Sequence, residues 1–483
     1  MKAPDLNFSP KGLYIGGQWQ EAADGGTFKT INPSNGKSLG AVPLAQESDV
    51  DRAVAAAAAA FPEWSKMPVK ERAATLERLA DRLVDHRDEL GMMDCVDSGN
   101  ALNGMKGDVD WSAHTFRFFA GLLTEIKGET SSQGAGHLNF TQRQPYGVVA
   151  KINPFNHPVR FCAEKAAAAL AAGNTVVAKA SEQAPLSSLR FAELCDDILP
   201  PGVLNVVTGD GVTGSAMVRH VDVARIGIVG SVETGRIIAK EAAEGLKPVT
   251  LELGGKNPII IFPDAEPERA AAAAIKGMNM NRQGQSCSST SRVLVHESIH
   301  GEVTQELVKQ TEALPVWLPW LADNEVGPIV SDKQFNKIME FIHSGQTQGA
   351  VLLTGGERPT APELADGFFI SPTVFDKVTA EMQIGNQEIF GPVMSVMPWS
   401  DYEEMISCAN GLMYGLTASI MTNDLKQAME PAERIEAGYV WINSSGRYLG
   451  APYGGWKQSG IGQEECLEEL LSYTRVKNVN LRW

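Results

Sequence analysis

The feature that most constrains the fold of this chain is an alternation of β-branched runs with helical segments, starting near Tyr146. The runs are "GVVAKI", "NTVVAKA", "VLNVVTG", "RIGIVG" and "PVTLELGG", and the segments between them include "RFCAEKAAAALAAG", "LSSLRFAELCDDI" and "ETGRIIAKEAAE". Strands that alternate with helices predict βαβ units and a parallel sheet. A second alternating region extends from Asn257 to about Ser459. The sequence therefore predicts an α/β fold.

The two flanks of this region have different patterns. Residues 49–93 place apolar side chains at helical spacing between charged ones, so the first third of the chain is expected to be helical. The end, "LLSYTRVKNVNLRW", alternates polar and apolar residues, which is typical of a terminal strand and could pair with the sheet edge of another subunit. A chain of 483 residues is too long for one core. At roughly 100–200 residues per domain, we expect two or three domains.

Composition excludes several classes of partner and location. The net charge of −16 argues against nucleic acid and against anionic membrane surfaces. The first residues, "MKAPDLNFSPKGLYIGG", lack the apolar core of a signal peptide. No run approaches the ~18 apolar residues of a membrane span. The six cysteines form neither a CxxC pair nor a dense framework, which predicts reduced thiols in a cytoplasmic protein and no metal site.

Three residues stand out as candidates for catalysis. Cys287 lies in "NRQGQSCSST", where small neighbours and backbone N–H donors suit a nucleophilic thiol, although a loop cysteine without a role is the alternative. Glu252 lies within the apolar run "VTLELGG", where burial favours a raised pKa and a general base, or else a structural ion pair. Asn156 stands between the prolines of "PFNHP" and either donates to an oxyanion or shapes a turn.

Three further strings could bind a nucleotide. "GDGVTG" (residues 209–214) has the spacing of a dinucleotide fingerprint, but a strand-to-helix turn needs glycine in any case. Gly230 and Ser231 follow a strand and precede a helix, which suits a phosphate and equally an ordinary N-cap. Lys179 and Glu182 follow another strand, where they could bond ribose hydroxyls or remain solvated loop charges.

Taken together and in this order, the motifs resemble those of the NAD(P)-dependent aldehyde dehydrogenase family, along nearly the whole chain. "PFNHP" resembles the family's Pro-Trp-Asn-Phe-Pro, "KASE" its Lys-Pro-Ser-Glu, and "VGSVETG" its Thr-Gly-Ser-x-x-x-Gly. "LELGGK" and "GQSC" match its base and nucleophile segments, and "EIFGPV" and "PYGGWKQSGIGQE" resemble two later signatures. The chain departs from the family pattern at Phe155, His157, Ala180 and Gln463.

The resemblance implies a role for each catalytic candidate. Cys287 would attack the aldehyde to form a thiohemiacetal, and the Asn156 amide with the Cys287 backbone N–H would stabilise the oxyanion. Hydride transfer would leave a thioester, which water activated by Glu252 would hydrolyse to a carboxylic acid. Because family members that transfer the acyl group to coenzyme A typically lack this glutamate, the resemblance implies a hydrolytic member.

The resemblance also implies a cofactor site. Lys179 and Glu182 would hold the adenosine ribose, and Gly230 and Ser231 the pyrophosphate, which returns "GDGVTG" to the role of a turn. Glu388 would bind the nicotinamide ribose with Phe390 near the ring. The Glu182 carboxylate would repel a 2′-phosphate, so NAD is expected, with NADP possible.

Two other functions rival that of a dehydrogenase: a cofactor-independent esterase and a non-catalytic relative.

Matching positions to the family sketches a polar substrate funnel. Its members would be Trp111, His157, Arg160, Glu164, Asn281, Ser286, Ser288, Arg447 and Tyr453. This set favours an aldehyde with a polar, anionic or aromatic tail, bound by Arg447 or His157. In a second hypothesis Glu164 pairs with a cationic amino- or trimethylammonium-aldehyde. In a third, Arg447 and Glu164 pair with each other or point away.

The expected architecture follows the same resemblance. A Rossmann-like cofactor-binding domain would comprise residues 1–125 and 147–252, and an α/β catalytic domain residues 253–458. Residues 126–146 and 459–483 would form a small β oligomerisation arm. The expected assembly is a homodimer or a homotetramer.

Overall fold

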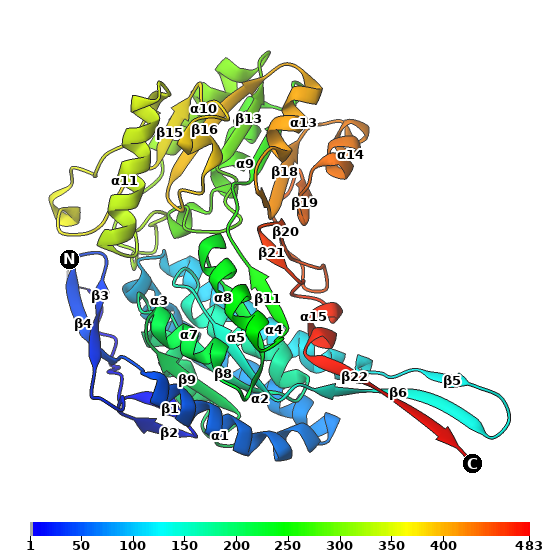
Figure 1. Cartoon of the computed structure of the whole chain (residues 1–483). Helices are drawn as coiled ribbons and strands as arrows, with labels where there is room; N and C mark the ends of the chain where they lie inside the picture. Colours follow the sequence, from blue (N-terminus) through cyan, green and yellow to red (C-terminus); the bar gives the residue numbers. More distant parts are fainter. Residues whose placement is uncertain (1–2) are drawn as a thin grey trace.

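The computed structural model describes residues 3–483, and its lower half in Figure 1 is built on an eight-stranded sheet. The strand order is β2-β1-β9-β8-β7-β10-β11-β21, and the five strands from β7 to β11 are parallel. These five are the β-branched runs that the sequence predicts, so the parallel sheet is confirmed. Their bounds are Val148–Ile152 (β7), Thr175–Ala180 (β8), Leu204–Thr208 (β9), Val223–Val229 (β10) and Val249–Glu252 (β11).

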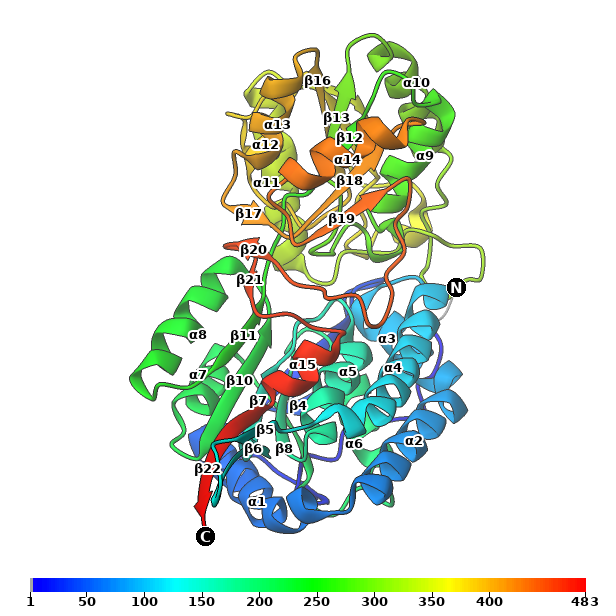
Figure 2. The same cartoon turned by 90° about the vertical axis from the view of Figure 1, so that its right-hand side faces the viewer.

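Helices cover both faces of this sheet (Figure 2). The alanine-rich α5 is buried at every position, because it lies between the sheet and helices α4 and α6, and small side chains allow that close approach. The helices of this half are α1 (Glu47–Lys66), α2 (Val69–Asp85), α3 (Arg87–Ser98), α4 (Leu102–Leu122), α5 (Pro158–Ala171), α6 (Leu186–Leu194), α7 (Gly211–Arg219) and α8 (Val232–Glu244), with the 3₁₀ turn η1 (Leu123–Glu125).

The expectation that the first third is helical is wrong for residues 13–43, which form four strands before α1 begins. The strands are β1 (Leu13–Ile15), β2 (Gln18–Gln20), β3 (Thr27–Asn32) and β4 (Lys37–Pro43). β1 and β2 form a hairpin around Gly16 and Gly17, which have φ of 61° and 77°. Two adjacent residues with positive φ are what a tight hairpin requires, so the "GG" pair was the signal for this turn.

A seven-stranded sheet forms the upper half of the molecule in Figure 1, with the order β14-β15-β16-β13-β12-β18-β19. Its strands are β12 (Pro258–Ile261), β13 (Arg292–His296), β14 (Val351–Thr354), β15 (Thr373–Asp376), β16 (Val393–Trp399), β18 (Thr417–Met421) and β19 (Tyr439–Ile442). The helices around it are α9 (Pro267–Gly277), η2 (Met280–Arg282), α10 (His300–Glu312), α11 (Asp332–Thr347), η3 (Pro362–Leu364), α12 (Gln383–Asn386), α13 (Tyr402–Asn410) and α14 (Leu425–Arg434).

The chain passes between the two sheets twice. It rises through residues 253–257, between β11 and β12, and it returns after β19 through β20 (Trp456–Lys457), which pairs with β17 (Tyr414–Gly415). On the return, β21 (Gly460–Ile461) pairs with β11 and so completes the edge of the eight-stranded sheet. Both crossings lie at the junction of the two halves (Figures 1 and 2).

A narrow ribbon of three strands projects from the lower half and carries the C-terminus at its tip (Figure 1). Its order is β22-β6-β5, from β5 (Thr130–Ser132), β6 (His137–Pro145) and β22 (Thr474–Arg482), and α15 (Leu467–Ser472) leads into it. Val476, Leu481 and Trp483 are exposed on it. Across residues 3–483, no helix is long and apolar enough to cross a membrane, and no three or more His, Cys, Asp or Glu side chains gather as a metal site would require.

Candidate active site

Glu252 lies at the end of β11, where the first crossing begins. Its side chain is 4% exposed, and neither carboxylate oxygen has a hydrogen-bond partner among the described residues. Burial, together with the negative charge of Glu464, raises the pKa of Glu252 well above its usual range. A buried carboxylate without a partner is costly, so such a group indicates a functional position more than a structural one.

Cys287 lies in residues 278–291, the segment between α9 and β13, which we call the nucleophile loop. This loop contacts the second crossing, the chain that returns after β19. The Cys287 Sγ is 4.0 Å from the hydroxyl of Tyr453. The next residue, Gly454, lies beside Glu252: a Cβ built there would be 3.4 Å from the Glu252 carboxylate. Burial raises the pKa of the Cys287 thiol to about 11, while the positive charge of Arg447 acts in the opposite direction. The dipeptide Tyr453–Gly454 therefore brings the thiol and the carboxylate to one place.

Asn156 reaches the same loop from the other side. It follows β7 and directly precedes His157, the residue that caps α5. The Asn156 side-chain amide donates to the carbonyl of Gln285 at 3.0 Å, and its main-chain carbonyl accepts from Asn100. The amide carries two protons, so one remains available beside the nucleophile loop. Asn156 thus meets the loop of Cys287 at Gln285, and Tyr453–Gly454 brings Glu252 to the same place.

The charged positions of the predicted funnel are paired with protein groups. His157 Nδ1 lies 2.7 Å from Asp108, and burial lowers the pKa of His157 to about 4, so the ring is neutral. Glu164 accepts from Arg160 at 2.7 Å and lies 2.9 Å from the Lys165 ammonium. Burial disfavours the Glu164 carboxylate, but these two cations outweigh burial and lower its pKa to about 2. Glu164 is therefore an ionised carboxylate that is paired with two cations.

Arg447 is the funnel cation with the most unused hydrogen-bonding capacity. It pairs with Glu465 through one terminal nitrogen, and its guanidinium lies 3.6 Å from the centre of the Tyr453 ring. Its Nε is buried without a partner among residues 3–483. Trp111 is nearby, with the Arg160 guanidinium 4.9 Å from its ring centre.

The predicted nucleotide residues lie at the carboxyl ends of β8 and β10, the two strands on either side of β7. Lys179 is the second-last residue of β8, and its ammonium is 3.5 Å from Glu182. Burial lowers the pKa of Lys179. Ser231 caps α8, accepting from Thr234 N at 3.1 Å, and directly follows Gly230. The first N–H groups of that helix lack intrahelical acceptors, which suits an anion.

Glu388 and Phe390 come from the other half of the molecule. Glu388 accepts from the Gly255 amide at 2.9 Å, and burial raises its pKa to about 7, while that N–H acts in the opposite direction. Phe390 has φ of 57° and meets Phe155 edge-on at 5.8 Å between ring centres. Residue 155 is one of the departures from the family pattern, and its phenyl ring lies beside Phe390.

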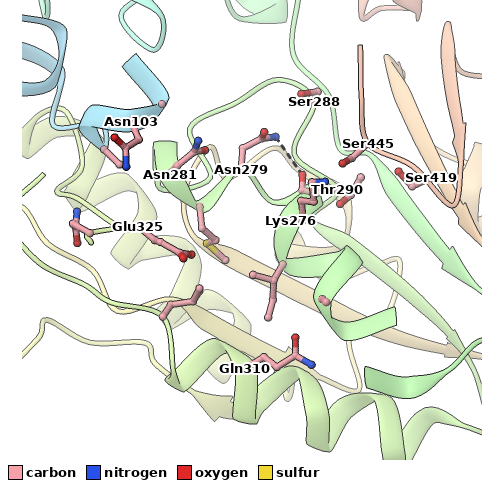
Figure 3. Close-up of a pocket in the computed structure, with 18 of the residues that line it drawn as sticks. Asn103, Lys276, Asn279, Asn281, Ser288, Thr290, Gln310, Glu325, Ser419 and Ser445 are labelled. Atoms are coloured by element: carbon pink, nitrogen blue, oxygen red, sulfur yellow. Dashed lines mark hydrogen bonds between the residues drawn. The ribbon is translucent and has the colours of Figure 1, made fainter. Parts of the chain in front are cut away.

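The remaining predicted positions lie at the start of α7 or on the segment from η2 to Ser288. "GDGVTG" forms the start of α7, where Asp210 caps the helix through Val212 N at 2.8 Å, as the turn interpretation holds. Asn281 and Ser288 line a cavity of about 830 Å³ between α4, α9 and α10, with both polar and apolar residues in its lining (Figure 3). The hydroxyls of Ser286 and Ser288 lie 3.2 Å apart.

Several groups at the site carry no motif and were missed in the sequence analysis. Asp108 and Arg282 pair with each other at 2.7 Å around His157. Glu464 pairs with Lys165, and Glu465 with Arg447 and Arg160. The acidic string "GQEECLEEL" resembles an exposed helix surface, yet Glu464, Glu465 and Glu469 are buried. These ion pairs join residues that lie far apart in the sequence, so no local pattern predicts them.

Comparison with known proteins identifies the family. The model of the aldehyde dehydrogenase family matches residues 19–479. Aldehyde dehydrogenase tropH of Talaromyces stipitatus is 40% identical over 479 residues, which is 97% of this chain and 93% of the relative. The chain belongs to the aldehyde dehydrogenase family and is an enzyme of that class. Both the predicted family and the predicted fold are confirmed.

Solved structures agree in fold. The NAD⁺ complex of aldehyde dehydrogenase from Bacillus cereus has a TM-score of 0.95 and 40% identity, covering 99% of this chain and 97% of that one. Betaine aldehyde dehydrogenase (betB) from Staphylococcus aureus, in complex with NAD⁺, has a TM-score of 0.96 and 36% identity, covering 99% of this chain and 95% of that one.

Proposed function

We propose that this enzyme oxidises an aldehyde to a carboxylic acid with NAD, through a thioester on Cys287. The observation that carries the proposal is that a thiol, a free amide proton and a carboxylate unpartnered within the described chain meet where the loop of Cys287 contacts Tyr453–Gly454. Cys287 supplies the nucleophile, Asn156 the oxyanion donor and Glu252 the base. An esterase would need no cofactor, so dependence on NAD separates the two hypotheses.

The residues divide the reaction between them. The sulfur of Cys287 gives its proton to water and bonds the aldehyde carbon, and the Asn156 amide stabilises the negative oxygen. A bound nicotinamide would supply the acceptor for the hydride of that carbon, and loss of the hydride lets the oxygen form the carbonyl of a thioester. Glu252 then takes a proton from water, whose oxygen attacks the thioester carbon. The C–S bond breaks, the acid leaves, and the sulfur regains a proton.

The residues present fit a dinucleotide. Ser231 and the start of α8 suit the pyrophosphate, while Lys179 and Glu182 suit the adenosine ribose. Glu388, held by the Gly255 amide, suits the nicotinamide ribose, with Phe390 beside the ring. The Glu182 carboxylate favours NAD over NADP. The NAD⁺ complexes of the Bacillus and Staphylococcus relatives support the same cofactor.

The proposed substrate carries a polar, anionic or aromatic tail. Arg447 supports the anionic tail, because Glu465 is its only hydrogen-bond partner within the described chain. Tyr453 and Trp111 support an aromatic group. The cationic alternative loses its expected counter-ion, since Glu164 is already occupied by Arg160 and Lys165. His157 is neutral and bound to Asp108, so we assign the anion to Arg447 instead.

The first experiment is NADH formation over a panel of aliphatic, aromatic, acid-tailed and cationic aldehydes, with NADP in parallel. Cys287→Ala should abolish cofactor reduction. Arg447→Ala should reduce kcat/KM for the acid-tailed aldehyde about tenfold to a hundredfold, the range of one lost charge-assisted bond, and leave a simple aliphatic one nearly unchanged. Equal losses on both would refute the anion assignment. Reduction of cofactor by Cys287→Ala would refute the whole proposal.

The domain division of residues 1–125 and 147–252, 253–458, and 126–146 with 459–483 is retained as a proposal. The separate sheets support it, although β21 at residues 460–461 joins the eight-stranded sheet.

The exposed Val476, Leu481 and Trp483 support a homo-oligomer, dimer or tetramer, that buries the ribbon of β5, β6 and β22. Light scattering of the purified protein tests this. The six free cysteines support a cytoplasmic location.

A further inference from the structure

Residues 253–257, the first crossing, contact both Glu388 and the loop of Cys287. The Gly255 amide donates to Glu388, and a Cβ at Gly254 would lie 2.2 Å from the Glu388 carboxylate. A Cβ at Gly255 would lie 2.6 Å from the carbonyl oxygen of Cys287. Glycine is therefore required at both positions by close approach. The crossing packs directly against the nucleophile loop.

Asn257 ends this crossing, and every atom of its amide is in use. Its Nδ2 donates to the carbonyl of Cys287 at 2.7 Å and to that of Ser289 at 3.0 Å. Its Oδ1 accepts from the Thr417 amide at 3.0 Å. Asn257 is 2% exposed. Because Thr417 N–H can only donate, the orientation of the amide is determined, with the nitrogen toward the nucleophile loop.

The nucleophile loop needs such support. It has no strand ladder of its own, and its backbone enters the left-handed region at Asn279, Gln283 and Gly284, with φ of 55°, 52° and 67°. Conformations of this kind persist only where surrounding groups hold them. Holding the carbonyl of Cys287 fixes the adjacent peptide plane and so restricts where its Cα and Cβ can lie, and an error of ~1 Å in a reacting atom costs about a hundredfold in rate.

We infer that Asn257 is a positioning residue that sets the orientation of the Cys287 thiol by holding the carbonyls on either side of Ser288. This inference rests on the proposed function for the role of Cys287. Asn257 itself contacts neither the thiol sulfur nor, in the proposed mechanism, the aldehyde. It ties the loop to β18 in the seven-stranded sheet, so the thiol keeps its place relative to Glu252.

The test uses a matched pair of asparagines. Asn205, in the eight-stranded sheet, has the same pattern: its Nδ2 donates to Gly202 and Val176 carbonyls at 2.8 and 3.4 Å, and its Oδ1 accepts from Gly16 N at 2.9 Å. Asn257→Asp and Asn205→Asp each replace the donating nitrogen with oxygen. Asn257→Ser is the second variant, which introduces no charge.

The primary readout is the rate of iodoacetamide alkylation at Cys287 across pH, followed by peptide mapping, with the half-buried Cys408 as the internal reference. We expect both Asn257 variants to alkylate Cys287 about tenfold more slowly, with kcat lowered at least as much, KM for NAD unchanged and Cys408 unaffected. Asn205→Asp should lower Tm and leave the Cys287 rate unchanged.

Wild-type alkylation of Cys287 in either folded Asn257 variant overturns the inference. So does a loss of kcat that follows Tm equally in the Asn257 and Asn205 variants. Alkylation requires neither aldehyde nor cofactor. A wild-type protein that alkylates at Cys287 yet reduces no NAD would refute the proposed function, while the Asn257 comparison would still decide the positioning role.

Discussion

Glu252, at the end of β11, and Glu164, in the middle of α5, are both buried glutamates, yet their environments are opposite. Glu252 is 4% exposed, neither of its oxygens has a hydrogen-bond partner within residues 3–483, and its pKa is raised. Glu164 is 3% exposed and is held by Arg160 and Lys165, and its pKa is lowered to about 2. Burial alone therefore does not determine the state of a carboxyl group. The partners decide whether it serves structure or remains available for chemistry.

Removing the unpartnered carboxyl should give the largest effect. Glu252→Gln keeps the shape of the side chain but cannot accept a proton from water, so hydrolysis of the thioester should slow by about 10²- to 10⁴-fold. Stability should not fall and should rise at neutral pH, because the change removes a buried charge and leaves no partner unpaired. Rapid mixing with NAD and aldehyde should show one burst of NADH per site followed by slow turnover. Undiminished steady-state turnover would remove Glu252 from the mechanism.

The same change at the partnered carboxyl should instead affect the fold. Glu164→Gln leaves Arg160 and Lys165 buried beside a neutral amide, and breaking a buried pair in this way costs about 3–5 kcal/mol of unfolding free energy. Urea unfolding followed by fluorescence measures it. Glu468→Gln, on the exposed face of α15, is the control and should have no effect. A fully stable Glu164→Gln protein would show that the cluster does not depend on this charge.

The smallest expected effect is a contrast in the pH dependence of stability. Glu164 has a folded pKa of about 2, below the unfolded value near 4.3, so its contribution is present above about pH 4.3 and is lost as pH falls toward 2. Glu252 has a raised folded pKa, so its ionisation costs stability as pH rises above about 4.3. Glu252→Gln should gain stability relative to wild type at neutral pH. Glu164→Gln should lose less unfolding free energy than wild type as pH falls from about 4.3 toward 2.

Denaturant unfolding of wild type and both variants from pH 3 to pH 8 separates these contributions. Parallel curves for the three proteins would contradict the assignment of opposite pKa shifts. The comparison uses differences between variants, so titration of other groups cancels.

The sequence predicted what is encoded locally. The strands β7 to β11 and the helices between them follow from period and composition, and Cys287, Glu252 and Asn156 lie in short motifs whose neighbours explain their chemistry. The Arg160–Glu164 pair could also have been predicted from the sequence, since residues four apart share a helix face. The third hypothesis, that Arg447 and Glu164 pair with each other, did not foresee that each has a different partner, Glu465 and Arg160.

The missed features depend on contacts across long stretches of chain. Glu464 and Glu465 reach the site only because the second crossing folds back over α5, which no periodicity reveals. The role of Asn257 depends on the conformation of a loop thirty residues later, where the carbonyls of Cys287 and Ser289 face its amide. Side-chain identity at these positions is ordinary, and only the assembled geometry distinguishes them.

The pairing of β21 with β11 has a consequence for how the protein is made. Gly460 is the register partner of Glu252, so the strand that carries the carboxylate remains a sheet edge until residues 460–461 arrive. During synthesis, residues 253–459 must all leave the ribosome before that edge closes, although the other strands of the sheet already exist. A nascent chain thus keeps this carboxylate in water, at its ordinary acidity. We expect the pairing of Glu252 with Gly460 to be among the last contacts of this sheet to form.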